Sequence, residues 1–110
     1  NCMKMLAEEF LIRTGLSSRH KGFRYLADAI RMVREDASLL HNVTKRLYPR
    51  IACRYDAKWQ TIERDMRILV EKAWENNAPM LLKSIGYTHS YRPYTREFIY
   101  LASIYPGEEE

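Results

Sequence analysis

The sequence predicts an all-α domain of about six helices with a central helix-turn-helix. Apolar residues recur at the spacing of amphipathic helices, and no stretch alternates apolar and polar residues between turn signals as a strand would. The 110 residues are 46% hydrophobic, which is enough for one core and leaves little room for a second. We therefore expect residues 1–110 to form a single domain.

Two helices are predicted in the first third of the chain. The first has apolar residues at helical spacing and a stop at Gly15; its apolar residues are Met5, Leu6, Phe10, Leu11 and Ile12. The second should begin between residues 18 and 21 and end at Asp36. Its apolar stripe comprises Phe23, Leu26, Ala27, Ile30 and Val33, and three arginines should face outward, namely Arg24, Arg31 and Arg34. Residues 38–43 should form a short connection with at most one helical turn.

Two further helices are predicted around a tight turn. Proline is tolerated in the first turn of a helix, so the third helix should begin at Tyr48 or Pro49. It should end at Tyr55, because Asp56 can adopt the left-handed conformation that a tight turn requires. The longest helix should then cover residues 58–76. Its buried stripe follows helical spacing and comprises Ile62, Met66, Leu69 and Ala73.

The last part of the chain predicts two more helices. Asn77 and Pro79 should separate the long helix from a short one over residues 80–85. The last helix is predicted over residues 96–104, with Thr95 as its cap.

The net charge of +4 lies in one segment of the chain. Residues 41–72 contain eight basic and four acidic residues, which gives 8 − 4 = +4, and the ten basic and ten acidic residues elsewhere cancel. Such a concentration is the electrostatic footprint of a protein with an anionic partner. Charge alone fits a solvated helical face equally well.

Two helices joined by a short turn lie within this basic segment. Ala52 is small where the second helix should cross the first, and Ile51, Tyr55 and Ile62 should hold the pair together. This is the spacing of a helix-turn-helix, whose second helix enters the major groove of DNA. Short helical hairpins also occur in proteins that bind no nucleic acid. The residues on the outer face of the second helix must therefore distinguish DNA binding from a purely structural hairpin.

The outer face of the second helix carries residue types that can read bases. Five polar residues lie off the buried stripe in its first half: Gln60, Thr61, Glu63, Arg64 and Arg67. Arginine can donate two hydrogen bonds to guanine, glutamate can accept one from cytosine, and glutamine can pair with adenine. Four basic residues flank them as candidate contacts to the DNA backbone: Arg46, Arg50, Arg54 and Lys58. The tight turn, the buried apolar stripe of the second helix and the local positive charge coincide in this segment. Their coincidence favours DNA recognition.

Enzymatic, metal-binding and membrane functions are not expected, and no cofactor is implied. The chain has no Gly-rich phosphate loop, and His20, His41 and His89 lack a second ligand at helical spacing. Cys2 and Cys53 cannot make a disulfide framework, and free thiols fit a reducing cytoplasm. We expect Cys53 to be a buried, inert thiol. No apolar run approaches the length of a membrane span.

The chain resembles the C-terminal DNA-binding domain of the stage-zero sporulation response regulator family. The matching segments are HKGFRYLADAIRMV, VTKRLYPRIACRYD, IERDMR, EKAW, SIGYT and the stretch from Pro93 through REFI. The resemblance implies a six-helix fold and a transcription factor that binds a short promoter box, commonly as tandem copies on double-stranded DNA. It places base-reading positions on Thr61, Glu63, Arg64 and Arg67.

Several positions depart from the family pattern. Thr61 stands where the family usually has an arginine, Ile68 where it often has a histidine, and Asp65 replaces a small residue. The loop over residues 88–93 is a few residues shorter than in the family. These departures concern the preferred DNA sequence more than DNA binding itself. The family's regulator carries an N-terminal receiver domain, whose α/β pattern is absent here. The chain is therefore either an excised effector domain, which the start at Asn1 rather than Met favours, or a divergent relative with another N-terminal part.

Protein partners are the remaining expectation. The resemblance implies a contact with the RNA polymerase sigma subunit through residues 75–84, and a second copy on adjacent boxes. Five tyrosines crowd the last quarter of the chain, where some should remain available to that copy: Tyr87, Tyr91, Tyr94, Tyr100 and Tyr105. The alternative function is an interaction module that keeps the fold without specific DNA reading.

Overall fold

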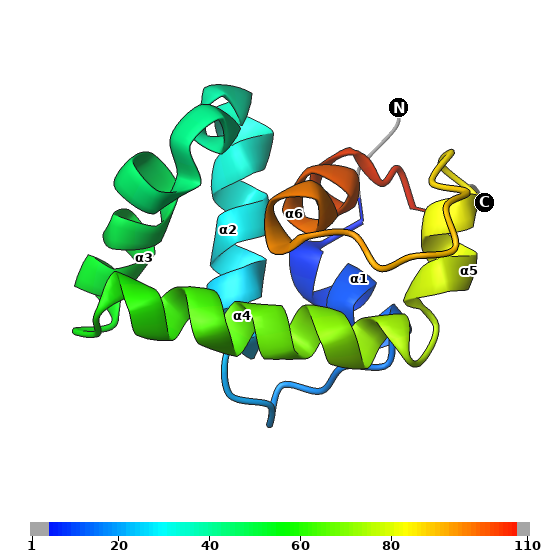
Figure 1. Ribbon diagram of the computed structural model, residues 1–110, viewed down its shortest axis with the longest axis horizontal. Coiled ribbons are helices and arrows are strands. Elements are labelled where there is room, and N and C mark those ends of the chain that lie inside the picture. Colours follow the sequence, from blue (N-terminus) through cyan, green and yellow to red (C-terminus); the bar gives the residue numbers. More distant parts are fainter. Residues whose placement is uncertain (1–4, 108–110) are drawn as a thin grey trace.

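The computed structural model describes residues 5–107, and within this range the chain forms helices and no strand (Figure 1). The α-helices are α1 (Ala7–Arg13), α2 (Phe23–Glu35), α3 (Tyr48–Arg54), α4 (Trp59–Trp74), α5 (Ala78–Lys83) and α6 (Thr95–Ile104). A 3-10 helix, η1 (Ala37–Asn42), and a π-helix, η2 (Val43–Leu47), connect α2 to α3. The all-α fold with six helices is confirmed. None of the helices in the described range has the length and apolar character needed to cross a membrane.

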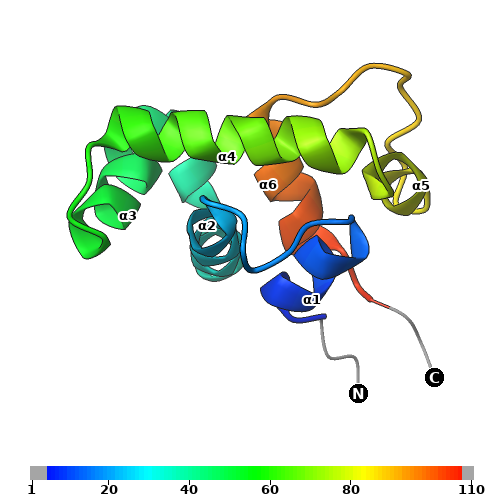
Figure 2. The same ribbon diagram turned by 90° about the horizontal axis from the view of Figure 1, so that it is seen from below.

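The other helices pack on two sides of a central pair, α2 and α6. α2 and α6 pack against each other, α4 crosses both of them on one side, and α1 packs on the other side (Figure 2). The predicted apolar stripe of α2 is buried throughout, as is that of α4. Phe10 of α1 meets two aromatic rings of the C-terminal region, with ring centres 6.0 Å from Phe98 and 5.0 Å from Tyr105. This aromatic cluster joins the first helix to the last.

The first helix buries only part of the apolar set that the sequence placed at helical spacing. Phe10 and Leu11 are buried together with Ala7, whereas Leu6 is 62% and Ile12 is 56% exposed. Leu6 precedes α1, which begins at Ala7, and only one face of so short a helix can reach the core. Its end at Gly15 is confirmed: Gly15 has φ +104°, and the amide of Leu16 donates to the carbonyl of Leu11 at 3.1 Å.

The second helix starts later than predicted. Residues 17–20 form a turn in which the amide of His20 donates to the carbonyl of Ser17 at 2.9 Å, and α2 begins at Phe23. Gly22 precedes it with φ +92°. Arg34, predicted to face outward, is half-buried because α2 packs along α6, and its Nε donates to the carbonyl of Ser103 at 3.3 Å.

Gly22 is required for the contact between α2 and α4. A Cβ atom at this position would lie 3.0 Å from the carbonyl oxygen of Asp65, and its positive φ disfavours other residues. We expect Gly22→Ala to lower the free energy of unfolding by about 1–3 kcal/mol, measured by urea unfolding. Gly86→Ala is the matched control, since Gly86 has φ +103° but no neighbour within 4 Å. Equal losses in both variants would show that the close approach to Asp65 contributes nothing.

The remaining differences between predicted and observed element boundaries lie in or next to the connecting segments. The segment predicted as a short connection over residues 38–43 forms η1 and the start of η2. The spacing of the apolar residues did not indicate either helix. α3 begins at Tyr48 as predicted, but α5 begins at Ala78, because Pro79 is accommodated in its first turn. Thr95 is the buried first residue of α6 and makes no capping hydrogen bond, so its predicted capping role was wrong.

The two ends of the described chain meet. A Cβ atom on Gly107 would lie 3.2 Å from the Cβ of Met5, so these residues are in contact. Both lie on the side of the molecule away from α4 (Figure 2).

Candidate nucleic-acid interface

α3, a tight turn and α4 form the helical hairpin that the sequence predicts. Asp56 adopts a left-handed conformation with φ +52°, and the amide of Ala57 donates to the carbonyl of Ala52 at 2.9 Å, which closes the turn. Ile51, Ala52 and Ile62 are buried where the two helices pack. Lys58 then occupies the N-cap position of α4 with an extended backbone. The turn therefore directs the start of α4 to the surface.

α4 separates an apolar inner face from a polar outer face. The inner residues are at most 3% exposed: Ile62, Met66, Leu69 and Ala73. Of the predicted base-reading residues, Gln60, Arg64 and Arg67 are exposed, and Thr61 and Glu63 are half-buried. α4 lies along one side of the molecule, and the other labelled helices lie on its inner side (Figure 2). The structure brings all five residues onto one accessible surface.

Two of these residues are held in ion pairs along the helix. Arg67 Nη1 donates to both carboxylate oxygens of Glu63, one turn earlier, at 2.9 and 3.0 Å. Arg64 Nε and Nη2 lie 3.4 and 3.5 Å from Oδ1 of Asp65. The pair of Arg67 and Glu63 joins partly exposed side chains and contributes little to stability, so it orients Arg67 without preventing exchange for another partner. In the other pair only Arg64 is exposed.

Asp65 itself does not belong to the outer face. It is buried where α4 meets Gly22 before α2, and its Oδ2 has no hydrogen-bond partner within residues 5–107. The departure from the family pattern at this position therefore acts through packing and through Arg64.

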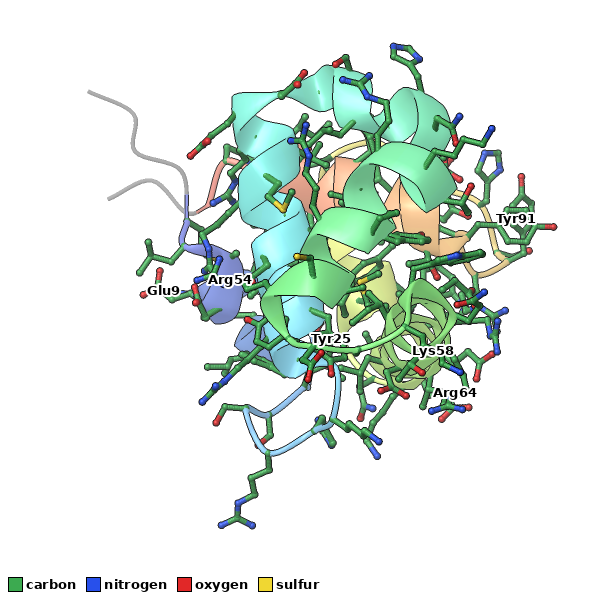
Figure 3. All side chains as sticks on the ribbon, turned by 90° about the vertical axis from the view of Figure 1, so that its left-hand side faces the viewer. Glu9, Tyr25, Arg54, Lys58, Arg64 and Tyr91 are labelled. Atoms are coloured by element: carbon green, nitrogen blue, oxygen red, sulfur yellow. The ribbon has the colours of Figure 1, made fainter. Side chains whose placement is uncertain are left out.

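The four flanking basic residues do not share one surface. Lys58 and Arg64 lie on the same side of the molecule, whereas Arg54 lies on the side of α3 away from them (Figure 3). Arg54 Nη1 is 3.8 Å from Oδ2 of Asp28. Arg46 donates to the carbonyl of Ser38 at 3.0 Å, and Arg50 is exposed on α3. Lys58 and Arg50 make no ion pair with any residue in the described range.

A model of the family described as "Sporulation initiation factor Spo0A C terminal" matches residues 7–104, which is nearly the whole chain. The chain belongs to this family. It is thus a DNA-binding domain of the sporulation response regulator type, a domain of transcription regulation, and the Spo0A C-terminal family is not a family of enzymes.

An ionic network that sequence reasoning missed supports the hairpin of this Spo0A C-terminal domain. Asp28 is 3% exposed within the apolar stripe of α2 and accepts hydrogen bonds from the hydroxyl of Tyr55 and from Arg31 Nη2, both at 2.5 Å. Desolvation, and then the bond to Asp28, raise the pKa of Tyr55. The network fixes the end of α3 to α2. Its only sequence signal was a carboxylate inside an apolar stripe, three residues before Arg31.

The cysteine and histidine predictions had mixed outcomes. Cys53 is exposed on α3, so its prediction as a buried thiol was wrong; the buried face of α3 is occupied by Ile51 and Ala52. His20 Nδ1 accepts from the amide of Ser17 at 3.0 Å, which fits a structural role. Within residues 5–107, no three His, Cys, Asp or Glu side chains converge as metal ligands would. Cys2 lies outside the described residues.

The tyrosines of the last quarter divide into two groups. Tyr87 and Tyr105 are buried, whereas Tyr91, Tyr94 and Tyr100 are exposed, Tyr94 by 83%. In the region that the resemblance links to the sigma subunit, Leu82 is fully buried and Met80 on α5 is 68% exposed.

Proposed function

We propose that this domain reads a short promoter box in the major groove of DNA with the outer face of α4, as the second helix of a helix-turn-helix. The observation that carries the proposal is the accessible polar face with Arg64 and Arg67, on a helix whose opposite face is buried. The side chains on such a face select bases, while flanking cations contact phosphates. The domain acts on double-stranded DNA in the cytoplasm.

Each reading residue has a role that follows from its chemistry. Arg64 and Arg67 donate to guanine, and Glu63, which already orients Arg67, accepts from cytosine. Gln60 pairs with adenine, and Thr61 offers a methyl group to the methyl of thymine. Of the candidate backbone contacts, Lys58 and Arg50 suit phosphates best, followed by Arg46. Arg54 suits them least, because its guanidinium lies toward Asp28 and away from Arg64.

Binding-site selection from random duplexes tests this assignment at one fixed salt concentration. We expect Arg64→Ala to lose discrimination at one base position by about 1–3 kcal/mol, because a bidentate contact is removed. Lys58→Ala is the matched control: it should weaken all sequences alike and lower the salt slope by about one unit. Uniform loss for Arg64→Ala, or intact binding when Arg64 and Arg67 are both replaced by alanine, would contradict the proposal.

An interaction module is the second candidate, and the exposure of Met80 favours it. Met80 on α5 is 68% exposed and is therefore accessible to a protein partner such as the RNA polymerase sigma subunit. Binding of the sigma subunit without any shift of duplex DNA, at any salt concentration, would favour this function over DNA reading.

We also propose that two copies occupy tandem boxes, with Tyr91 and Tyr100 available to the neighbouring copy. The isolated domain should then be a monomer. Sedimentation showing a tight dimer without DNA would contradict this assembly.

A further inference from the structure

A groove of about 500 Å³ runs beside the reading face of α4. Its polar lining residues come from three segments: Thr44 and Tyr48 from η2 and α3, Glu63 and Arg67 from α4, and Arg92, Tyr94, Thr95 and Arg96 from the chain that enters α6. Three arginines and one carboxylate line the groove, and a second carboxylate, Glu71 of α4, pairs with Arg92 beside it.

The loop over residues 86–94, which forms one wall of the groove, is held in place by its own side chains. The buried hydroxyl of Tyr87 donates to the carbonyl of Tyr91 at 2.8 Å, and the rings of His89 and Tyr91 stack with centres 4.7 Å apart. Trp74 at the end of α4 meets the ring of Tyr87 edge-on at 5.9 Å. The 86–94 loop is thus attached to α4 and presents its polar groups at fixed positions.

Arg92 is the cation that this loop places nearest to α4. Its Nη1 lies 3.7 Å from Oε2 of Glu71, in a pair whose side chains are 39% and 42% exposed. Water screens such a pair, so a phosphate can replace the carboxylate at small cost. Arg96 is anchored differently: its Nε donates to the carbonyl of Leu40 at 2.6 Å, which leaves its terminal nitrogens available.

The loop and the reading face of α4 point to the same side of the molecule. The 86–94 loop projects beyond α4 on the side where α4 is uncovered (Figure 2). Tyr91 lies on the same side as Lys58 and Arg64 (Figure 3). A rod-shaped partner that contacts the outer face of α4 therefore also meets the loop.

We propose that this groove receives the sugar–phosphate backbone bordering the major groove that α4 occupies, with Arg92, Arg96 and Tyr94 as phosphate contacts. The inference rests on the proposed function and adds a second contact that the helical hairpin alone does not provide. Charge complementarity and continuity with the reading face select DNA as the occupant.

Arg92→Ala tests the contact by fluorescence anisotropy across a salt series. The probes are a labelled duplex carrying the sequence enriched by selection and a duplex of scrambled sequence. We expect several-fold weaker binding to both, with the salt slope reduced by about one unit and the base preference retained. Arg92→Lys should restore most of the affinity. The control is Arg13→Ala, which removes the same charge from the last turn of α1, outside the lining of the groove.

A chemical change in the DNA gives an independent readout. A neutral methylphosphonate is placed at each phosphate bordering the selected box in turn. One position should weaken the original domain and leave Arg92→Ala unaffected. If Arg92→Ala keeps the affinity and salt slope while Arg64→Ala loses base preference, the groove contact is wrong and the proposed function stands. If instead Arg64→Ala leaves the base preference unchanged, the proposed function fails whatever Arg92 does.

Discussion

Replacing Phe98 with alanine is expected to lower the free energy of unfolding by about 3–5 kcal/mol. Phe98 is fully buried on α6, which packs against α1, α2 and α4, and its ring meets that of Phe10 at 6.0 Å. The truncation removes buried apolar surface and leaves a cavity where these helices meet. The total free energy of unfolding of a domain of this size is about 5–15 kcal/mol, so this variant would lose much of its stability.

Urea unfolding followed by far-ultraviolet circular dichroism measures this change. Tyr100→Ala is the control on the same helix, because its side chain is 44% exposed and its loss should cost about 1 kcal/mol or less. A Phe98→Ala variant as stable as Tyr100→Ala would mean that α6 is not central to the core.

The second large effect is expected at Asp28, where Asp28→Ala should destabilise the domain by about 1.5–3 kcal/mol through lost hydrogen bonds to a charged group. The change leaves the hydroxyl of Tyr55 without its acceptor, releases Arg54 and leaves Arg31 paired with Glu8 alone. Both arginines are partly exposed and regain water, which keeps the loss below that of a fully buried ion pair.

Tyr55→Phe separates the parts of this effect, because it removes only the hydroxyl. Combining it with Asp28→Ala in a double-mutant cycle measures the coupling between the two residues by urea unfolding. Coupling close to zero would contradict the proposed anchoring of α3 by Asp28. The raised pKa of Tyr55 also sets a pH dependence: the contribution is complete below the unfolded pKa and is lost as the pH rises through the folded pKa.

Helical periodicity was sufficient to predict the long elements of the fold. α2 and α4 each present a buried stripe over several turns, so the repeating pattern identifies both the helix and its inner face. α1 has only seven residues, with apolar Leu6 just before it and apolar Ile12 within it, so two faces fitted the same pattern. Packing against α2 and α6 decided between them, and that information is not local.

The residues of the candidate interface could be predicted where helical periodicity places them on one face of α4. They could not be predicted where tertiary packing sets their orientation. The outer face of α4 follows from its buried face, which is why the five residues predicted to read bases lie together. The orientation of Arg54 depends on Asp28, which precedes it by 26 positions and was assigned no role from sequence. Likewise, the groove joins η2, α4 and the 86–94 loop, and their meeting depends on tertiary packing.

The contact between Met5 and Gly107 has a topological consequence. The two ends of the described chain meet on the side of the domain away from α4. A short peptide linker between them would therefore close the backbone into a ring at a low entropic cost. Circular permutation is tolerated in such folds when new ends open in exposed, weakly bonded backbone. The order in which the helices follow one another is therefore separable from how they pack. Both described ends also lie on the side of the domain opposite α4, away from the candidate interface (Figure 2).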